Sequence, residues 1–500
     1  MRPFEVALLF VEILAALVLI LAPRDRLRWL DYLVPIPSLM ALAQVTAESP
    51  RWQMIPAYAL AAVLLIWWIA RRGFAKGWFD RRGMVKRLAA ALVVIGLAIS
   101  VALPVALPVF RFPHPNGPHA IGTVTYHWTD PTRREVFATD PGTRRELMVQ
   151  IWYPADVGAS RARAPYVEDA DALFITQARL HGLPDFTFSH LRYVTTNATV
   201  GIPVSAGART YPVLIFLEGL TGYRQMNTFQ VEALVSAGYI VVAIDQPFVA
   251  ASVVFPDGRQ AIGLSKAQID PLIQQSLNPK EPAPTLKGAA FPNGIIPYLA
   301  QDIAFVLDKL AASNIGDPQR LLAGKLDMQK VGIFGVSIGA IVAGEACRVE
   351  TRLRACLMMD APMTTGLVRD GLKQPGMWIT REAATMRAEG WAAADIRQHQ
   401  STMRAAFEVS PAQTYLVRVA GMFHANLTDA PHFSPLVSWL GVTGPIDRRR
   451  GHTIINAYSA AFFDRHLKDR RTPLLDDAVA ERPEVSFDAR RPGHARLGSP

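Results

Sequence analysis

Four long apolar runs fill the first 110 residues, and they restrict the possible folds of this chain more than any other feature. The runs are Val6–Ala22, Trp29–Val45, Met54–Ala70 and Leu88–Phe110. Each is close to the roughly 17–25 residues that an apolar helix needs to cross a bilayer, and the later chain has no comparable run. We therefore predict a transmembrane domain of four helices over residues 1–110.

Basic residues between the runs predict the orientation of this domain. The loop at residues 71–87 has seven Lys or Arg residues against one Asp, which places it in the cytoplasm by the positive-inside rule. Two prolines interrupt the second run, but if that run spans, the basic segment at residues 24–28 also lies in the cytoplasm. Everything after Phe110 is then extracytoplasmic. The alanine- and arginine-rich composition favours a bacterium, in which this side is the periplasmic face of the inner membrane.

Charge and cysteine content exclude several classes of protein. Of the formal net charge of +10, residues 1–110 carry +6, and the remaining +4 form no basic stripe for nucleic acid. The two cysteines, Cys347 and Cys356, are too few for a disulfide scaffold or a zinc cluster. Paired cysteines and two buried free thiols both remain open in an oxidising compartment. No metal or organic cofactor is predicted.

The rest of the chain reads as one α/β domain. After a proline-containing linker at 111–124, buried apolar strands alternate with helical patterns, which predicts a mostly parallel sheet covered on both faces. We place this domain at 125–475, with insertions at about 160–209 and 249–293. Residues 476–500 read as a disordered tail.

The segment VGIFGVSIGA, residues 331–340, predicts a nucleophile. A buried strand runs into a Gly-x-Ser-x-Gly turn, and a helix follows, which is the pattern of a nucleophile elbow. Gly335 and Gly339 flank Ser337 where larger side chains would collide with the turn. Ser337 is therefore the predicted nucleophile.

A serine nucleophile needs a base and an acid, which α/β-hydrolases carry in the order Ser, Asp or Glu, His. Asp360 ends the next predicted strand, and His424 closely follows a later one. Both positions are strand carboxyl ends, where open α/β sheets build their sites. We expect His432 to lie in a lid or at the surface, His399 on a solvated helix, and Asp245, which precedes the serine, to be structural.

Backbone N–H groups are expected to hold the oxyanion of an acyl-transfer reaction. One predicted donor is the N–H of Ile338, at the start of the helix after the nucleophile. The other is the N–H of Leu220, in the loop FLEGLTGYR, where Gly219 allows the chain to turn.

Several motifs together resemble the platelet-activating factor acetylhydrolase family, of the plasma and intracellular type II isoforms, and its bacterial relatives. They are YPVLIFLEGLTGYRQMNTFQVEALVSAGYIVVAID, VGIFGVSIGA, LRACLMMDAP, FHANLTDAP and INAYSAAFFDRHL. The resemblance spans roughly Thr125–Leu475. It implies an α/β-hydrolase fold and calcium-independent, serine-dependent hydrolysis of short-chain or oxidised acyl esters.

By position, the resemblance assigns the triad to Ser337, Asp360 and His424, and the oxyanion donors to Leu220 and Ile338. The family usually has His before the serine and Phe after it, and has His-Gly-Leu in the oxyanion loop.

This chain differs from the family beside the nucleophile and in the oxyanion loop. It has Val336 and Ile338 around the serine, and Ala340 in place of a later glycine. Glu218 replaces the histidine of the oxyanion loop; it either pairs with Arg224 or changes the preferred pH of the site. Phospholipid specificity is therefore not carried over.

We predict a membrane-anchored serine hydrolase whose substrate is a small-molecule or lipid ester, with no nucleic-acid partner. One alternative is an acyltransferase that uses the same triad on a cell-envelope acceptor, and another is an inactive hydrolase-fold membrane scaffold. The two insertions either cap the site or lie at the surface away from it. The sequence does not predict the acyl length, the alcohol portion or the oligomeric state.

Overall fold

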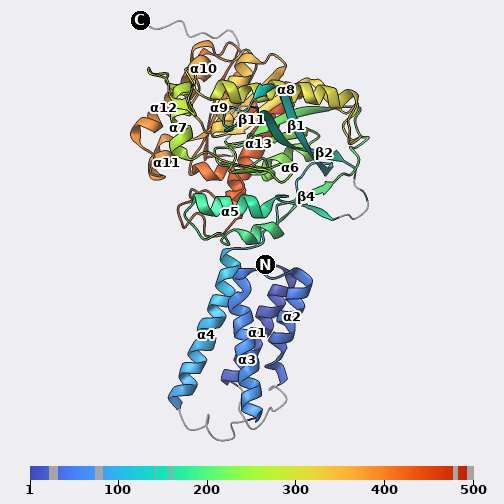
Figure 1. Ribbon diagram of the computed structural model, residues 1–500, viewed down its shortest axis with the longest axis vertical. Helices are drawn as coiled ribbons and strands as arrows, with labels where there is room; N and C mark the ends of the chain where they lie inside the picture. The colour runs from blue at the N-terminus through green and yellow to red at the C-terminus, as the bar shows by residue number, and fades with distance from the viewer. Residues whose placement is uncertain are drawn as a thin grey trace. The chain divides into compact units, whose positions relative to one another are not determined.

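The structure is a computed structural model that describes residues 1–21, 32–73, 83–140, 142–156, 158, 162–476 and 482–491. The chain divides into two compact units (Figure 1). The helical unit contains Met1–Arg111 together with Leu183–Val194 and Phe433–Leu436. The α/β unit contains the other residues.

The helical unit has four α-helices in its described residues (Figure 1), which are α1 (Pro3–Leu21), α2 (Ile36–Glu48), α3 (Ile55–Gly73) and α4 (Gly83–Ala106). Two described stretches, Trp52–Ala70 and Arg87–Ala106, are long and apolar enough to cross a membrane. Many large apolar side chains of this unit are exposed, as lipid contact requires; Ile66 and Leu92 are 65% and 64% exposed.

The second predicted span differs most from expectation. Its helix α2 begins only at Ile36, because Pro35 and Pro37 favour a helix start over a helix interior. Its 13 residues extend about 20 Å at roughly 1.5 Å per residue, which is less than the roughly 30 Å hydrocarbon core. The basic segments at residues 24–28 and 74–82 lie outside the described residues, so the orientation stays a prediction.

Part of the first predicted insertion, 160–209, belongs to the helical unit. The Tyr193 hydroxyl donates to the Pro50 carbonyl at 2.9 Å. Phe186 packs edge-to-face on Trp52, with ring centroids 5.2 Å apart. The segment between α2 and α3 therefore holds residues from a distant part of the sequence.

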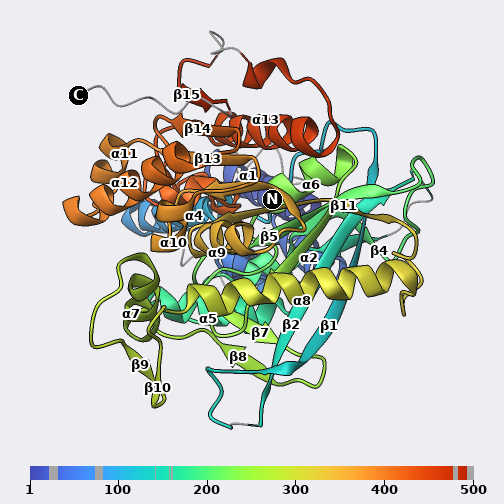
Figure 2. The same cartoon turned by 90° about the horizontal axis from the view of Figure 1, so that it is seen from above.

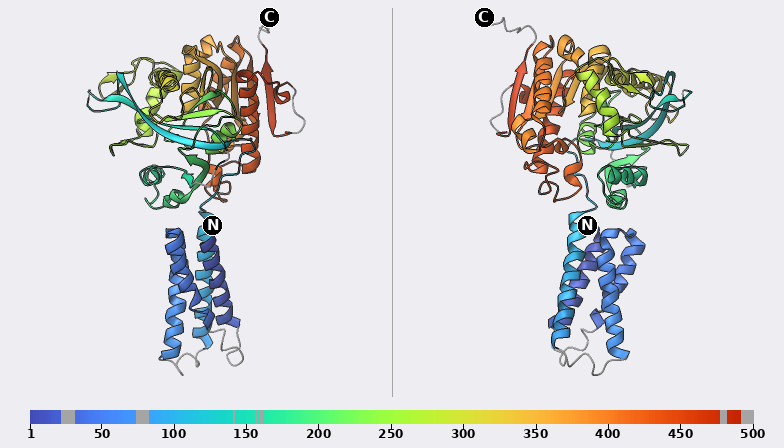
Figure 3. Two further views of the ribbon diagram at one scale, coloured as in Figure 1. Left: turned by 90° about the vertical axis from the view of Figure 1, so that its right-hand side faces the viewer. Right: turned by 60° about the vertical axis from the view of Figure 1, so that its left-hand side comes forward.

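The α/β unit is organised around an eleven-stranded sheet in its described residues, with the order β15-β14-β13-β12-β11-β5-β6-β2-β1-β4-β3. The strands are β1 (Ala120–Arg134), β2 (Arg144–Ala155), β3 (Arg163–Pro165), β4 (Thr195–Val200), β5 (Tyr211–Leu217), β6 (Ile240–Asp245), β11 (Leu326–Val336), β12 (Leu353–Met359), β13 (Gly376–Arg381), β14 (Thr414–Val419) and β15 (Val485–Arg490). Six neighbouring strands of this sheet, β14, β13, β12, β11, β5 and β6, are mutually parallel. Figure 3 shows β1 and β2 in teal toward one edge and β15 in red at the other.

Helices cover both faces of this sheet (Figure 2). The α-helices in the described residues of this unit are α5 (Ala170–Leu180), α6 (Thr228–Ser236), α7 (Lys266–Leu277), α8 (Ile296–Ile315), α9 (Ile338–Val349), α10 (Thr365–Asp370), α11 (Ala383–Ala388), α12 (Ala393–Val409) and α13 (Arg448–Leu467). Val213 and Ile215 of β5 face the core under α8 and α9, whereas Leu214 and Phe216 face the core under α6 and α13. A strand buried on both faces explains the continuous apolar run of β5.

Short hairpins complete the second insertion. They are β7 (Ser252–Val254) with β8 (Gln260–Ile262), and β9 (Thr285–Leu286) with β10 (Ala289–Ala290).

Two predictions for the ends of the α/β domain differ from the structure. The linker at 111–124 ends earlier, because β1 begins at Ala120 and pairs with β2 along its length. The predicted disordered tail at 476–500 contains a strand, since β15 pairs antiparallel with β14. Val485 and Phe487 lie opposite Val419 and Val417, so alternating apolar residues cover the sheet edge.

Candidate active site

The turn at Ser337 has the geometry of a nucleophile elbow. Ser337 lies between β11 and α9 with φ 58° and ψ −127°, a conformation that L-residues rarely adopt. A Cβ on Gly335 would lie 2.3 Å from the Gly339 carbonyl oxygen, and one on Gly339 would lie 2.3 Å from the Leu217 carbonyl oxygen. Both positions therefore require glycine. Ser337 is partly exposed while its neighbours are buried.

The predicted acid and base are hydrogen-bonded to each other. Asp360 follows β12 with φ 54°, and His424 lies in a short 3-10 helix, His424–Leu427, after β14. His424 Nδ1 lies 2.6 Å from Asp360 Oδ2. Among the described residues, the Ser337 hydroxyl makes no hydrogen bond to His424; such bonds are often long before substrate binds.

The predicted oxyanion loop lies directly against Ser337. A Cβ on Gly219 would lie 3.3 Å from Ser337 Cβ, so the chain approaches the serine closely here. Thr221, next to Leu220, has φ 56°. The N–H of Ile338 is at the first position of α9, where helical N–H groups have no partner within the helix. Both predicted donors thus lie on segments that border Ser337.

Cationic and polar side chains surround the carboxylate of Asp360, which is buried. Arg381 Nε lies 2.7 Å from Oδ2, and the Thr380 hydroxyl donates to Oδ1 at 2.8 Å. Burial alone would raise the pKa of Asp360, but Arg381, His399 and His424 outweigh it and hold the pKa well below its usual range. Asp360 is therefore ionised at neutral pH.

The expectation for His399 is wrong. His399 is only 1% exposed, and its Nε2 lies 3.4 Å from Asp360 Oδ1. The sequence did contain a signal, because His399 falls at helical spacing with Ile396, Met403 and Phe407, which are the buried stripe of α12.

Glu218 does not pair with Arg224, which rules out the first of its two predicted roles. Arg224 instead pairs with Asp245, which agrees with the structural role predicted for Asp245. Glu218 Oε1 accepts the N–H of Gln246 at 2.8 Å. Burial, followed by the nearby Asp245 charge, raises the pKa of Glu218 well above its usual value.

His432 is buried, in contrast to the predicted lid or surface position. It packs against Phe112 and His452, with ring centroids 5.5 and 5.0 Å apart. Burial lowers the pKa of His432 to about 4. Its ring lies in an aromatic cluster, whereas His424 is hydrogen-bonded to Asp360.

The two cysteines form a disulfide, which answers the question that the sequence left open. Cys347 of α9 and Cys356 of β12 are bonded, with a Cα–Cα distance of 6.5 Å. The bond ties the helix after the nucleophile to the strand that ends at Asp360.

Both predicted insertions contact the oxyanion loop. From the first, Gln177 of α5 donates its side-chain amide to the Thr221 carbonyl at 2.6 Å. At the start of the second, the Val249 carbonyl accepts the Thr221 N–H at 2.9 Å, and the Ala251 N–H donates to the Gly222 carbonyl at 2.9 Å. The insertions therefore support the loop that precedes the nucleophile.

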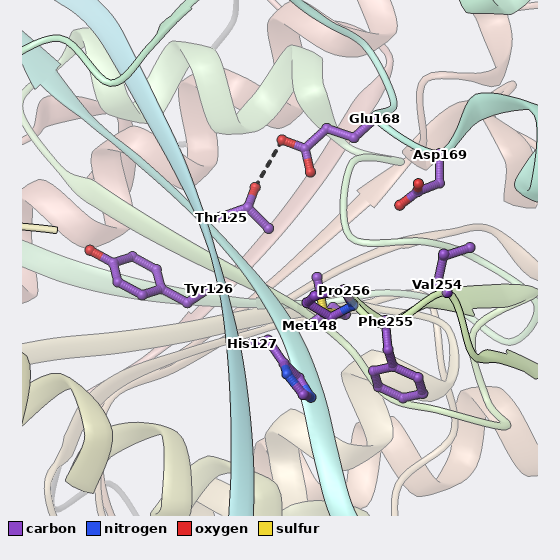
Figure 4. Close-up of a pocket in the computed structure, with 10 residues that line it drawn as sticks. Thr125, Tyr126, His127, Met148, Glu168, Asp169, Val254, Phe255 and Pro256 are labelled. Atoms are coloured by element: carbon purple, nitrogen blue, oxygen red, sulfur yellow. Dashed lines mark hydrogen bonds between the residues drawn. The ribbon is translucent and has the colours of Figure 1, made fainter. Parts of the chain in front are cut away.

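A cavity of about 480 Å³ lies against β1 and β2 (Figure 4). Its lining consists of Thr125, Tyr126, His127, Met148, Glu168, Asp169, Val254, Phe255, Pro256 and Gly258. In Figure 4 the Thr125 hydroxyl donates to Glu168, at 3.1 Å. None of the predicted site residues lines this cavity.

Comparisons with known proteins agree with the resemblance predicted from the motifs. The family described as platelet-activating factor acetylhydrolase, isoform II, matches residues 106–259 and 314–479, more than half of the chain. Platelet-activating factor acetylhydrolase of Gallus gallus is 20% identical over 391 residues, which cover 72% of this chain and 85% of that protein. A solved ferulic acid esterase from Streptomyces cinnamoneus superposes with a TM-score of 0.59 and 26% identity, over 76% of this chain and 99% of the esterase. The predicted α/β-hydrolase fold is confirmed.

Proposed function

Because the chain belongs to the platelet-activating factor acetylhydrolase, isoform II, family and is a carboxylic ester hydrolase, we propose that it cleaves short-chain or lipid-like acyl esters through Ser337, His424 and Asp360. The observation that carries this proposal is the strained turn at Ser337, at the sheet edge where His424 and Asp360 are hydrogen-bonded. Strain of about 1–3 kcal/mol per residue persists only where the surrounding fold imposes it, and it is common at active sites.

In the proposed reaction, His424 is the general base. Its Nδ1 is engaged by Asp360, so Nε2 is left to take the Ser337 proton as the hydroxyl attacks the ester carbonyl. The imidazolium then gives this proton to the departing alcohol, which leaves an acyl-enzyme. Water attacks the acyl-enzyme with His424 again as the base; the bond between Ser337 and the acyl group then breaks, the acid leaves, and the imidazolium returns the proton to Ser337. Asp360 remains ionised throughout and stabilises the imidazolium.

Two backbone donors are proposed to hold the tetrahedral oxyanion. The N–H of Ile338 is suited to this role because it opens helix α9, whose N-terminal partial positive charge favours an anion. The N–H of Leu220 is supported by the close approach of Gly219 to Ser337. Val336 and Ile338 replace bulkier family side chains, so we expect a pocket wall of different shape from that of the family.

The helical unit is proposed to anchor the enzyme in a membrane through four helices, with the α/β unit outside the cytoplasm. Two described apolar stretches of sufficient length support the anchoring. The basic loop at residues 71–87 supports the orientation. The Cys347–Cys356 disulfide also favours an oxidising compartment. A membrane-anchored esterase would encounter amphiphilic esters at the bilayer surface.

Covalent labelling with a fluorophosphonate tests the triad before the natural substrate is identified. We expect detergent-solubilised wild type to be labelled, and Ser337→Ala and His424→Ala to lose labelling while they retain the wild-type melting curve. Heat-denatured wild type is the control for nonspecific reaction. A folded wild-type protein that does not react would overturn the proposed mechanism and favour the inactive scaffold.

Assays on p-nitrophenyl esters of increasing acyl length then define the substrate class. Added alcohol or amine acceptors test for acyl transfer. Products that contain the acceptor in place of the free acid would replace hydrolysis with transferase activity.

A further inference from the structure

Four residues form a closed ring of contacts that includes the proposed acid and base. Asp360 Oδ2 contacts both His424 Nδ1, at 2.6 Å, and Arg381 Nε, at 2.7 Å. Arg381 also pairs with Glu389. Glu389 Oε1 accepts the backbone N–H of His424 at 3.1 Å, which closes the ring.

The members of the ring come from four separate segments. Asp360 follows β12 and Arg381 ends β13, while His424 follows β14. Glu389 lies in the turn between α11 and α12. These contacts thus join the ends of three neighbouring strands, β12, β13 and β14, to the connection between α11 and α12.

Trp391 covers this ring from the same connection. Its ring centroid lies 4.5 Å from Cζ of Arg381, which is within cation–π distance. Its ring also lies 6.0 Å from that of His424. The side chains of Arg381 and Asp360 are fully buried, and that of Glu389 is 16% exposed. The charges therefore interact with little solvent screening.

The charge balance of the ring explains the role of its second carboxylate, Glu389. If Asp360 were the only carboxylate beside the buried Arg381, the arginine would weaken the attraction between Asp360 and the His424 imidazolium. Glu389 shares the guanidinium, so the ring has a net charge of −1 when His424 is neutral and zero when it is the imidazolium. The transition state, in which the imidazolium forms, is then the neutral state of the cluster.

We propose that Glu389 is a positioning residue of the hydrolase reaction, which holds the base loop through the His424 N–H and balances the Arg381 charge. The inference rests on the proposed triad. The charged and titratable groups that face His424 and Asp360 in this cluster are Arg381, Glu389 and His399.

The substitutions Glu389→Gln and Glu389→Ala separate these two roles. Glutamine keeps an oxygen for the His424 N–H but removes the negative charge, which disfavours the imidazolium. We expect kcat to fall about tenfold with KM unchanged, and the acidic limb of the kcat/KM profile to move to lower pH by up to about one unit. Alanine also frees the loop, and we expect a loss of about a hundredfold in kcat.

Glu382→Gln is the matched control, because Glu382 precedes α11 in the same connection and is not part of the ring. All variants are compared with wild type by melting curve and by steady-state hydrolysis of a soluble p-nitrophenyl ester. Wild-type kcat and pH profile in folded Glu389→Gln would overturn the inference. A lower kcat with an unmoved acidic limb would also overturn it, because a purely structural role predicts that result. Failure of wild type to react with a fluorophosphonate would instead reject the triad itself.

Discussion

The backbone N–H of Ser337 donates to the carbonyl of Met359, the residue directly before Asp360, at 2.9 Å. This bond continues the parallel pairing of β11 with β12 into the elbow. The proposed nucleophile and the proposed acid are therefore held in register by the sheet itself. His424 reaches the same edge from β14, two strands further along.

Relief of strain at the nucleophile should stabilise the protein while it abolishes activity. Ser337 has φ 58° and ψ −127°, which favours glycine. We expect Ser337→Gly to be more stable than Ser337→Ala by about 1 kcal/mol, after the entropic cost of glycine is subtracted. Urea unfolding of the two detergent-solubilised variants measures the difference. Equal stabilities would show that the turn stores no more strain than the entropic cost of glycine.

The second glycine of the elbow should tolerate no side chain. A Cβ at Gly339 would lie 2.3 Å from the Leu217 carbonyl oxygen and 2.4 Å from that of Glu218, which are backbone atoms. We expect Gly339→Ala to lose about 3 kcal/mol of unfolding free energy and to abolish activity. Gly316→Ala is the control, because nothing lies within 4 Å of a Cβ there; its change should stay within about 0.5 kcal/mol. Similar melting curves for both variants would contradict the tight packing of the elbow.

The buried carboxyl of Glu218 should make stability depend on pH. The pKa of Glu218 is higher in the folded state than in the unfolded state, where it is roughly 4.3. At a pH between these two values, the native state holds a proton that the unfolded state has released. Stability therefore falls as pH rises through this window. We expect Glu218→Gln to match wild type near pH 4 and to melt about 2–4 °C higher at pH 8. A difference in melting temperature that does not change with pH would show that Glu218 titrates normally.

The disulfide should stabilise the hydrolase unit modestly. Cys347 and Cys356 are nine residues apart, and cross-linking so short a loop is worth about 2–3 kcal/mol. We expect Cys347→Ala/Cys356→Ala to unfold at lower urea concentration by this amount and to retain activity. Maleimide should label unfolded wild type from native membranes only after reduction. Labelling without reductant would argue against an oxidised, extracytoplasmic domain.

Local patterns were sufficient to predict the elbow and the two residues that we propose as acid and base. Ser337 lies in a strand-turn-helix segment, and Asp360 and His424 follow strand ends, so alternating elements already bring them to one edge of a parallel sheet. Several other features depend on contacts between distant segments. The burial of His399 and the partners of Glu218 are examples, as is the pairing of the tail strand with β14.

What the sequence determined by itself was therefore the class of fold, the family and the residues proposed for chemistry, because these follow from periodicity and short motifs. Only the tertiary structure decided which charges meet around that chemistry. Arg381 and Glu389 are eight positions apart and resemble ordinary surface residues in the sequence. They join Asp360 and His424 only because the crossing connection folds back over the carboxyl ends of the strands.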